Sequence, residues 1–464
     1  MKTGKNKKNN SKWKNANLQM RQTVMDFSNG YIDFLNEVKT EREAVAKIIE
    51  MAKQHGYKDI STCKQLAAGD KVYASNKGKS IYLAQIGEEE LTKGFNCVGS
   101  HIDAPRLDLK QNPLYEDEGV ALFKTHYYGG IKKYQWATIP LALHGVIAKT
   151  DGSVVNMCIG EETGEPIFLI TDLLPHLAKK QEAKTLADGI NGENLNIVVG
   201  SMPLEGDESE NPVKANILNY LKLHYGMEEE DFRSAEIEAV PAFKAKSLGF
   251  DSGMVAAYGQ DDRVCAYTSL MAMLASDEKL KKTAICIFAD KEEVGSMGNT
   301  GMESQNFELF VMDLLEKTGI VHPYALQRTF SASKALSADV TAGFDPTFPE
   351  VMEKNNSSFL GNGVTIEKYT GARGKSGASD ANAEFVAYVR GLFEKDQISY
   401  QASEIGRVDE GGGGTIAYIL ADRGIEVLDC GVPLHSMHSP YETASKYDIY
   451  MAYRAYKAFL NSTK

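Results

Sequence analysis

The sequence lacks any apolar run close to the ~20 residues that span a bilayer, and its first residues lack the charged-then-apolar order of a secretory signal. It also contains only six cysteines, which are scattered singly and without a C-x-x-C pair. That spacing argues against a disulfide framework and against a zinc site built from thiolates. We therefore expect a cytoplasmic protein that neither spans nor binds a membrane.

Positive charge is also in short supply, because 51 lysines and arginines are outnumbered by 63 aspartates and glutamates, for a formal net charge of −12. Nucleic acids and anionic membranes are bound through basic surfaces, so neither is expected as a main partner. The lysine-rich stretch 2–14 is interpreted as a solvated, frayed arm rather than a nucleic-acid tail. With 43% hydrophobic residues, the 464-residue chain is long enough to form more than one domain.

Helical and strand-like patterns alternate along much of the chain. Thr40 and Glu43 form a capping box before a helical pattern that Gly56 ends, and residues 283–289 form a continuous apolar run typical of a strand covered on both faces. Further on, the patterns predict a helix at about 380–395, a strand near Ser399, a helix after Gly413, a strand at 425–430 and a last helix from about Tyr441. This repetition predicts an α/β fold, a three-layer sandwich around a mostly parallel sheet.

Residues 107–234 have a different character. They contain short β-like runs at 154–159, 167–171 and 195–200, an acidic loop at 205–210 and fewer helical patterns. We interpret them as a smaller, β-rich domain inserted into a domain formed by residues 1–106 and 235–464.

Chemically capable residues follow several predicted strands. Residues 94–100 resemble a short buried strand that leads into His101 and Asp103, which project to the same side of an extended backbone. A metal-binding imidazole with an orienting carboxylate fits this spacing, although a single H-x-D is a weak signal. Asp261 and Asp262 precede an apolar helix, where a carboxylate is either a metal bridge or an ordinary N-cap.

The adjacent Glu292 and Glu293 favour a metal site over ordinary structural roles, because they directly follow the buried strand 283–289. Two glutamates at the end of a buried strand raise the free energy of the fold unless their charges are compensated, and two metal ions would compensate them. One of them can bind metal while its neighbour activates a water molecule. Asp339 and His438 follow two more predicted strands, and each alone is as easily structural as functional.

Together these residues form a set of nitrogen and oxygen ligands expected for two zinc, manganese or cobalt ions that share one carboxylate. The candidate ligands are His101, Asp261 or Asp262, Glu292 or Glu293, Asp339 and His438. Zinc is the first choice of metal.

The motifs that contain these residues resemble, in their fixed order, those of the aspartyl aminopeptidase family, which includes the vacuolar aminopeptidase I type. The matching stretches are 100–106, 128–130, 260–263, 292–296, 337–339, 411–416 and 437–439. The resemblance covers the chain from about residue 90 to its end.

This resemblance implies that the metal ligands are His101, Glu293, Asp339 and His438, and that Asp261 bridges the two metals, with Asp262 as the fallback. It also implies that Asp103 orients His101 and that Glu292 is the general base. The substrates would be peptides with a free N-terminus, whose amine binds a metal or a nearby carboxylate. The inserted domain would be an interface for oligomerisation, and a tetrahedral dodecamer would follow.

Candidate substrate contacts lie in two loops. The glycine run 411–414 lets backbone approach a substrate closely, with Gly413 and Gly414 as the expected contacts, although a flexible turn is an equal alternative. Arg373 or Lys375 has the charge to pair with an acidic substrate side chain, whereas an ordinary exposed cation is the simpler interpretation.

Two regions depart from the family pattern. The family's histidine and charged residues are replaced in the stretch 134–140, which begins with Tyr134, and its histidines after Asp339 are replaced by Ala342 and Asp345. Both regions are associated with substrate and neighbouring subunits in the family, so the sequence does not predict a firm preference for N-terminal Asp or Glu. Rival functions are another dinuclear amidohydrolase, such as a carboxypeptidase or deacylase, and a non-catalytic shell protein.

Overall fold

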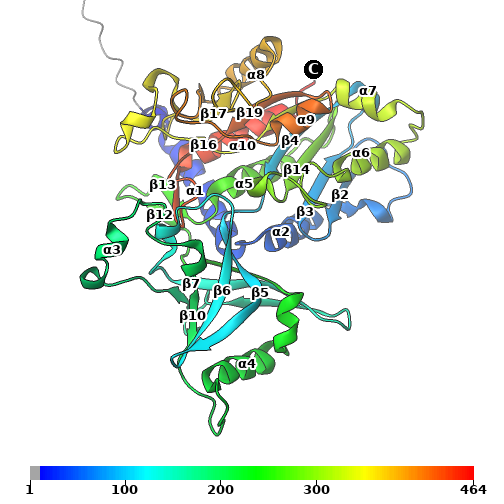
Figure 1. Cartoon of the computed structure of the whole chain (residues 1–464). Coiled ribbons are helices and arrows are strands. Elements are labelled where there is room, and N and C mark those ends of the chain that lie inside the picture. Colours follow the sequence, from blue (N-terminus) through cyan, green and yellow to red (C-terminus); the bar gives the residue numbers. More distant parts are fainter. Residues whose placement is uncertain (1–10, 464) are drawn as a thin grey trace, which may run out of the picture.

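A computed structural model describes residues 11–463, and its central feature is a nine-stranded sheet (Figure 1). In order across the sheet, the strands are β1 (Lys58–Asp59), β2 (Lys71–Asn76), β3 (Ser80–Gln85), β14 (Thr283–Ala289), β4 (Phe95–His101), β15 (Lys334–Ser337), β19 (Glu426–Gly431), β17 (Val364–Glu367) and β18 (Tyr400–Ala402). Neighbours among β14, β4, β15 and β19 are parallel, but β3 and β17 pair antiparallel with this group. The sheet is therefore mixed around a parallel centre.

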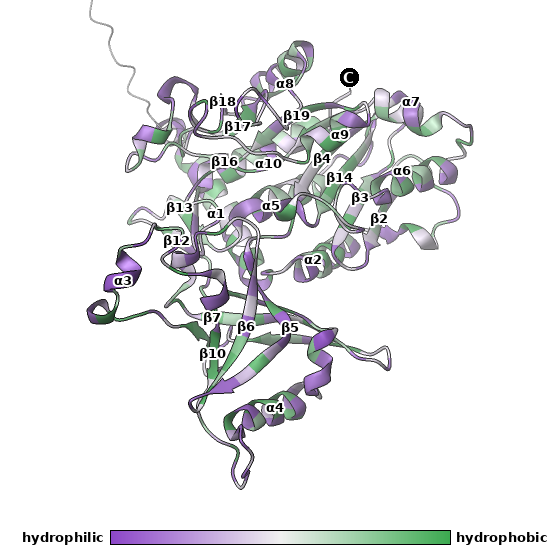
Figure 2. Cartoon of the chain, viewed as in Figure 1, coloured by the Kyte–Doolittle hydropathy of each residue, from purple (hydrophilic) through white to green (hydrophobic). Residues whose placement is uncertain are grey.

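Helices pack against both faces of this sheet. One face contacts α1 (Leu18–Glu37), α2 (Glu41–Gln54), α5 (Gln260–Leu274), α8 (Ala383–Lys395) and α10 (Lys446–Leu460), and the other contacts α6 (Asn306–Lys317), α7 (Ala325–Ser331) and α9 (Ala417–Asp422). Alternate residues of β14 point to opposite faces of the sheet. Phe288 belongs to the hydrophobic cluster on the face of α5 and α10, and Ile287 to the cluster on the face of α6 and α9. Helices such as α2 and α4 (Pro212–Tyr225) carry both hydrophilic and hydrophobic residues (Figure 2).

Most of the predicted elements are present. Thr40 and Glu43 form a capping box at the start of α2, and the apolar run at 283–289 is β14. The predicted final helix is wrong at its start, because Glu442–Ser445 form strand β21 and α10 begins only at Lys446. Pairing of β21 with the distant strand β13 (Met254–Ala257) fixes this backbone in an extended form, which the local sequence does not reveal.

A second, seven-stranded sheet lies beside the first one and has its own hydrophobic cluster. In order, its strands are β8 (Val154–Ile159), β7 (Leu141–Ala148), β11 (Glu236–Pro241), β5 (Arg106–Asp117), β6 (Val120–Tyr128), β10 (Ile197–Gly200) and β9 (Leu169–Ile170). It extends slightly beyond the predicted range 107–234 at both ends. The short helix α3 (Lys179–Glu182) and the longer α4 belong to this part of the chain.

A small third sheet joins elements near the carboxyl ends of the central strands. Its strands, in order, are β12 (Lys246–Leu248), β13, β21, β20 (Pro433–His435) and β16 (Thr341–Ala342). Among residues 11–463, no helix is long and apolar enough to cross a membrane. All six cysteines are free thiols, and four of them are buried.

The described part of the lysine-rich arm is ordered rather than frayed. Residues 2–10 lie outside the described part of the chain, but Lys12–Asn15 form a short 3-10 helix. The ring of Trp13 lies 5.6 Å from that of Tyr447, and the backbone N–H of Lys12 donates to the carbonyl of Gly361. Packing of one aromatic side chain therefore anchors this end of the chain to α10.

Buried charges connect the start of α2 to the second sheet. The ammonium of Lys39 lies 2.6 Å from the carboxylate of Glu161, and both side chains are less than a tenth exposed. Glu161 also contacts His144 of β7 at 3.1 Å, while the other ring nitrogen of His144 lies 2.7 Å from Glu43. We call Lys39, Glu43, His144 and Glu161 the junction cluster.

Replacing Glu161 with glutamine is expected to destabilise the protein by about 3 kcal/mol in urea unfolding, because removing one partner leaves a buried charge uncompensated. Although burial opposes it, hydrogen bonding with His144 and the charge of Lys39 hold the pKa of Glu161 at about 2. Its contribution is therefore present above about pH 4.5 and is lost as the pH falls towards 2. Glu193→Gln, in an exposed pair with Lys110, is the control and should leave stability almost unchanged, because solvent screens an exposed ion pair. Equal effects of the two variants at pH 7 would contradict the prediction.

Candidate metal centre

The residues singled out in the sequence meet at the carboxyl edge of the central parallel strands. His101 ends β4, Glu292 and Glu293 form a 3-10 turn just after β14, and Asp339 follows β15. Neighbouring parallel strands end at the same edge of a sheet, so residues far apart in sequence come together there. Asp261 enters from the start of α5, and His438 from the loop between β20 and β21.

Asp261 lies between the two histidines. Its Oδ1 is 3.2 Å from Nε2 of His101, and its Oδ2 is 3.1 Å from Nε2 of His438. The neighbouring Asp262 instead accepts the backbone N–H of His101 at 3.3 Å. Of the two aspartates, Asp261 therefore presents one oxygen to each imidazole.

Each histidine also faces a second carboxylate. Nε2 of His101 lies 3.7 Å from Asp339 and 3.8 Å from Glu292, and Nε2 of His438 lies 3.3 Å from Glu293. Two groups of three of these residues lie close enough together to hold a metal ion. One is His101, Glu292 and Asp339, and the other is His101, Asp261 and Glu293. The five predicted ligands and the predicted base thus form one cluster.

The donor atoms of this cluster fit divalent metal ions. Nε2 of His101 and Oε1 of Glu293 are buried and have no hydrogen-bond partner, which is costly for polar atoms inside a protein. Nδ1 of His101 is occupied, because it lies 3.1 Å from the backbone carbonyl oxygen of Asp103. The free Nε2 is therefore the nitrogen of His101 aimed at a metal, and the other donors in the cluster are Nε2 of His438 and carboxylate oxygens.

The charges of the cluster favour bound cations. Burial and the nearby carboxylate of Asp339 raise the pKa of Glu292 to about 8, and burial and Asp261 raise that of Glu293. Burial would raise the pKa of Asp261 as well, but the adjacent imidazoles of His101 and His438 hold it below its usual range. Several carboxyl groups crowded into a buried space repel one another, and positive ions relieve this repulsion.

Asp103 contacts His101, Glu292 and Glu293 on one side of the cluster. It is fully buried, and its two oxygens accept the backbone N–H groups of Glu292 and Glu293, each at 3.2 Å. Its Oδ1 lies 3.3 Å from Nδ1 of His101. The hydroxyl of Tyr128 donates to its Oδ2 at 2.7 Å.

Glu442 supports the other side, and sequence reasoning missed it. Its carboxylate accepts the backbone N–H of Asp261 at 3.0 Å and that of His438 at 2.7 Å. Burial and the charge of Asp261 raise the pKa of Glu442 to about 8. Its position in β21, a segment predicted to be helical, gave no local signal of this contact.

The predicted substrate contacts lie in two loops that contact each other, and Thr370 of one loop and Thr415 of the other line a small pocket with Asp339. Lys375 pairs with Asp380 at 3.1 Å, and its ammonium lies 3.8 Å from the centre of the Tyr369 ring. The N–H of Gly413 donates to the carbonyl of Thr370, and Gly414 lies near the carbonyl of Gly377. Lys375 and Arg373 line a hollow of about 380 Å³ next to this glycine-rich loop.

The residues that depart from the family pattern lie in a short helix, at a strand end and in a turn. Tyr134 is 40% exposed in a short 3-10 helix, and Ala342 ends β16. Asp345 accepts the backbone N–H of Thr347 two residues later, as a turn residue does. None of the three contacts the histidine and carboxylate cluster.

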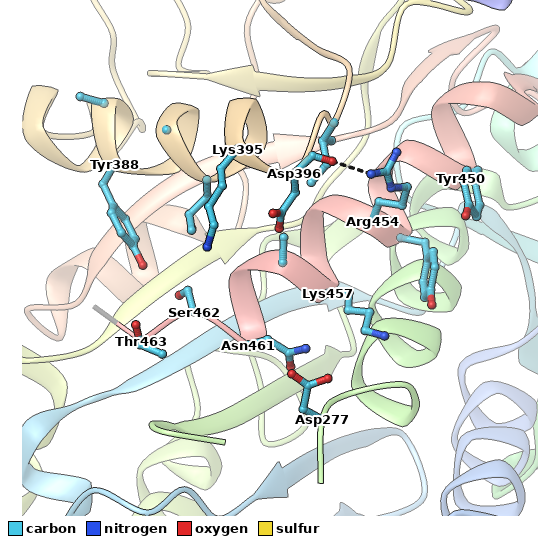
Figure 3. Close-up of a pocket in the computed structure, with 16 residues that line it drawn as sticks. Asp277, Tyr388, Lys395, Asp396, Tyr450, Arg454, Lys457, Asn461, Ser462 and Thr463 are labelled. Carbon is cyan, nitrogen blue, oxygen red and sulfur yellow. Dashed lines mark hydrogen bonds between the residues drawn. The ribbon is translucent and has the colours of Figure 1, made fainter. Parts of the chain in front are cut away.

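A larger hollow of about 960 Å³ lies between α8 and α10 and shares no residue with the metal cluster (Figure 3). Arg454 spans it by donating to the backbone carbonyl of Asp396. Lys395 and Lys457 lie in the last turns of the two helices, where cations compensate the partial negative charge of the helix ends. These cations thus have a structural explanation.

Comparisons with known proteins find related sequences and structures over nearly the whole chain. The family model described as "Aminopeptidase I zinc metalloprotease (M18)" matches residues 34–460. A probable M18 family aminopeptidase 1 from Clostridium acetobutylicum is 50% identical over 97% of each chain. The crystal structure of an M18 aminopeptidase from Thermotoga maritima is 42% identical, with a TM-score of 0.93 over 97% of this chain and 99% of that one.

A more distant structure shares the fold. The S. cerevisiae mApe1 dodecamer is 21% identical, with a TM-score of 0.76 over 95% of this chain and 97% of that one. The family match, the 50% identity and the α/β architecture confirm the resemblance noted in the sequence. The chain therefore belongs to the M18 family of aminopeptidase I zinc metalloproteases, and it is a hydrolase.

Proposed function

We propose that the chain is an aminopeptidase whose activity depends on two divalent metal ions. His101 and Asp339 hold one ion, His438 and Glu293 hold the other, and Asp261 bridges them. The observation that carries this proposal is the position of Asp261, which presents one oxygen to each imidazole at 3.1–3.2 Å. Zinc suits this set of nitrogen and oxygen ligands, and manganese and cobalt are the alternatives.

When bound, the two ions supply Lewis-acid polarisation of a peptide carbonyl and favour ionisation of water. Glu292 acts as the general base, because its carboxylate faces the cluster at 3.8 Å from His101 without being needed as a ligand. After taking a proton from water, Glu292 passes it to the amine that leaves when the peptide bond breaks. Asp103 holds the backbone of Glu292 in place throughout.

We infer that the substrate is a peptide with a free N-terminus. Its ammonium or amine group is attracted to the carboxylates beside the metals, which limits cleavage to the first peptide bond. A preference for acidic N-terminal residues is not part of the proposal, because Lys375 already pairs with Asp380.

We also propose that the chain has two domains with different functions. Residues 1–106 and 235–464 form a three-layer catalytic domain, and 107–234 form an inserted oligomerisation domain. Support comes from the separate core of the second sheet and from its exposed apolar side chains, such as Leu177 and Leu186. The yeast relative assembles as a dodecamer, and a closed homo-oligomer of this chain is the matching expectation.

The function is tested with matched pairs of substrates that differ only at the N-terminus. We expect hydrolysis of aminoacyl anilides and none of the same anilides after N-acetylation, and about two metal ions per chain under saturating supply. Elemental analysis and release of the aniline are the measurements. Release of aniline from the blocked substrates alone would exclude an aminopeptidase and instead indicate another amidohydrolase on the same scaffold.

A further inference from the structure

The tip of β6 reaches the metal cluster from the second sheet. β6 ends at Tyr128, and Gly129 and Gly130 follow it; we call these three residues the β6 turn. Gly129 has a φ of +74°, and a Cβ atom built on it would lie 3.4 Å from Cβ of Glu293. A Cβ on Gly130 would lie 3.3 Å from Nδ1 of His438. The β6 turn therefore lies directly against side chains from both halves of the cluster.

Tyr128 acts through Asp103 on His101 and on the backbone of Glu292 and Glu293. Its hydroxyl donates to the carboxylate that also lies 3.3 Å from the ring of His101 and accepts the N–H groups of Glu292 and Glu293. A carboxylate that accepts from all of these groups fixes their relative positions. Loss of the hydroxyl leaves Oδ2 of Asp103 short of a donor and loosens His101 together with the turn at 292–293.

Gly130 contacts His438 directly. Its carbonyl oxygen accepts a hydrogen bond from Nδ1 of His438 at 2.9 Å. That contact fixes the tautomer and turns Nε2 towards Asp261 and Glu293, at 3.1 and 3.3 Å. Both imidazoles thus depend on the same three-residue turn.

The phenol ring of Tyr128 is itself held in place. The guanidinium of Arg106, directly opposite Tyr128 in the pairing of β5 with β6, lies 4.0 Å from the ring centre. Arg106 is in turn paired with Glu41 at 3.2 Å and Glu238 at 3.3 Å. Burial raises the pKa of the Tyr128 phenol, so its hydroxyl keeps the proton that it donates.

We propose that the β6 turn is a positioning element that orients both metal-binding histidines, so that the second sheet sets how tightly the cluster holds its metals. This inference rests on the proposed two-metal function. Hydrogen-bonding partners behind metal ligands typically change metal affinity about 10–100-fold.

Tyr128→Phe tests the first contact, because it keeps the ring over Arg106 and removes only the hydroxyl. We expect the metal dissociation constants, measured by chelator competition with Zn²⁺, to rise about 10–100-fold, and the visible absorption of bound Co²⁺ to change. Tyr127→Phe is the matched control, since Tyr127 is the 43% exposed neighbour on the same strand. It should leave affinity and spectrum unchanged.

Gly130→Ala tests the second contact, because a methyl group 3.3 Å from Nδ1 displaces the ring of His438. We expect weakening of only one of the two metal-binding steps, whereas Tyr128→Phe affects both, since Asp103 supports His101 and the backbone of Glu293. Wild-type affinity for both metals in Tyr128→Phe would overturn the inference and leave the proposed function standing. A lower unfolding temperature of metal-free Tyr128→Phe with unchanged metal affinity would also overturn it, by showing a purely structural role. Failure of the wild-type protein to bind two metals would reject the proposed function itself.

Discussion

Glu292→Gln is expected to lower kcat for an aminoacyl anilide by about 10²–10⁴-fold, the usual contribution of a general base. Glutamine has nearly the same shape but cannot accept a proton from water. The backbone N–H of residue 292 still donates to Asp103, so the turn that contains Glu293 should keep its position. Metal content, measured by elemental analysis, should stay at about two ions per chain.

A matched variant separates this effect from a general loss of charge. Glu316, on the exposed side of α6, lies outside the cluster, and Glu316→Gln should keep wild-type kcat. If Glu292→Gln retained kcat within about tenfold of wild type, Glu292 would not be the base. If its metals were lost as well, Glu292 would be a ligand, as its grouping with His101 and Asp339 allows.

Asp261→Asn is expected to have the largest effect on metal binding, because Asp261 lies 3.1–3.2 Å from the imidazoles of both histidines. In the proposed two-metal site, Asp261→Asn removes a ligand from both ions and one negative charge between them. Both dissociation constants should rise by more than the about 10–100-fold typical of partners behind the ligands. Chelator competition measures the two constants, and activity should fall with metal occupancy.

Asp262→Asn distinguishes the two adjacent aspartates. Asp262 is fully buried and accepts the backbone N–H of His101, so its variant should alter stability more than metal occupancy. Asp339→Asn provides a second comparison and should weaken mainly the ion held with His101. Loss of both metals in Asp262→Asn but not in Asp261→Asn would reverse the assignment of the bridge.

The sequence predicted much of the central sheet because its strands are buried on both faces. Continuous apolar runs such as 283–289 have few alternative structures, and parallel strands bring their carboxyl ends to one edge. For this reason His101, Glu293 and Asp339 could be assigned to one site although they are far apart in the chain. The order of their motifs also identified the family.

Contacts made through tertiary pairing could not be predicted in the same way. Glu442 belongs to a short strand that exists because β13 pairs with it, and the local pattern instead favoured the start of a helix. Lys375 carries a charge suited to an acidic substrate, but its pairing with Asp380 depends on a loop conformation that no periodicity records. In both cases the deciding interaction depends on the folded neighbourhood rather than on nearby residues.

The spread of the cluster along the chain has a consequence for biosynthesis. The first histidine ends β4, and the last lies in the loop before β21, after most of the central sheet. A ribosome makes the chain from its N-terminus, so the second imidazole becomes available only after nearly all strands have been synthesised. The nascent protein is therefore expected to remain without a complete hydrolytic centre, and harmless to neighbouring nascent peptides, until late in its own translation.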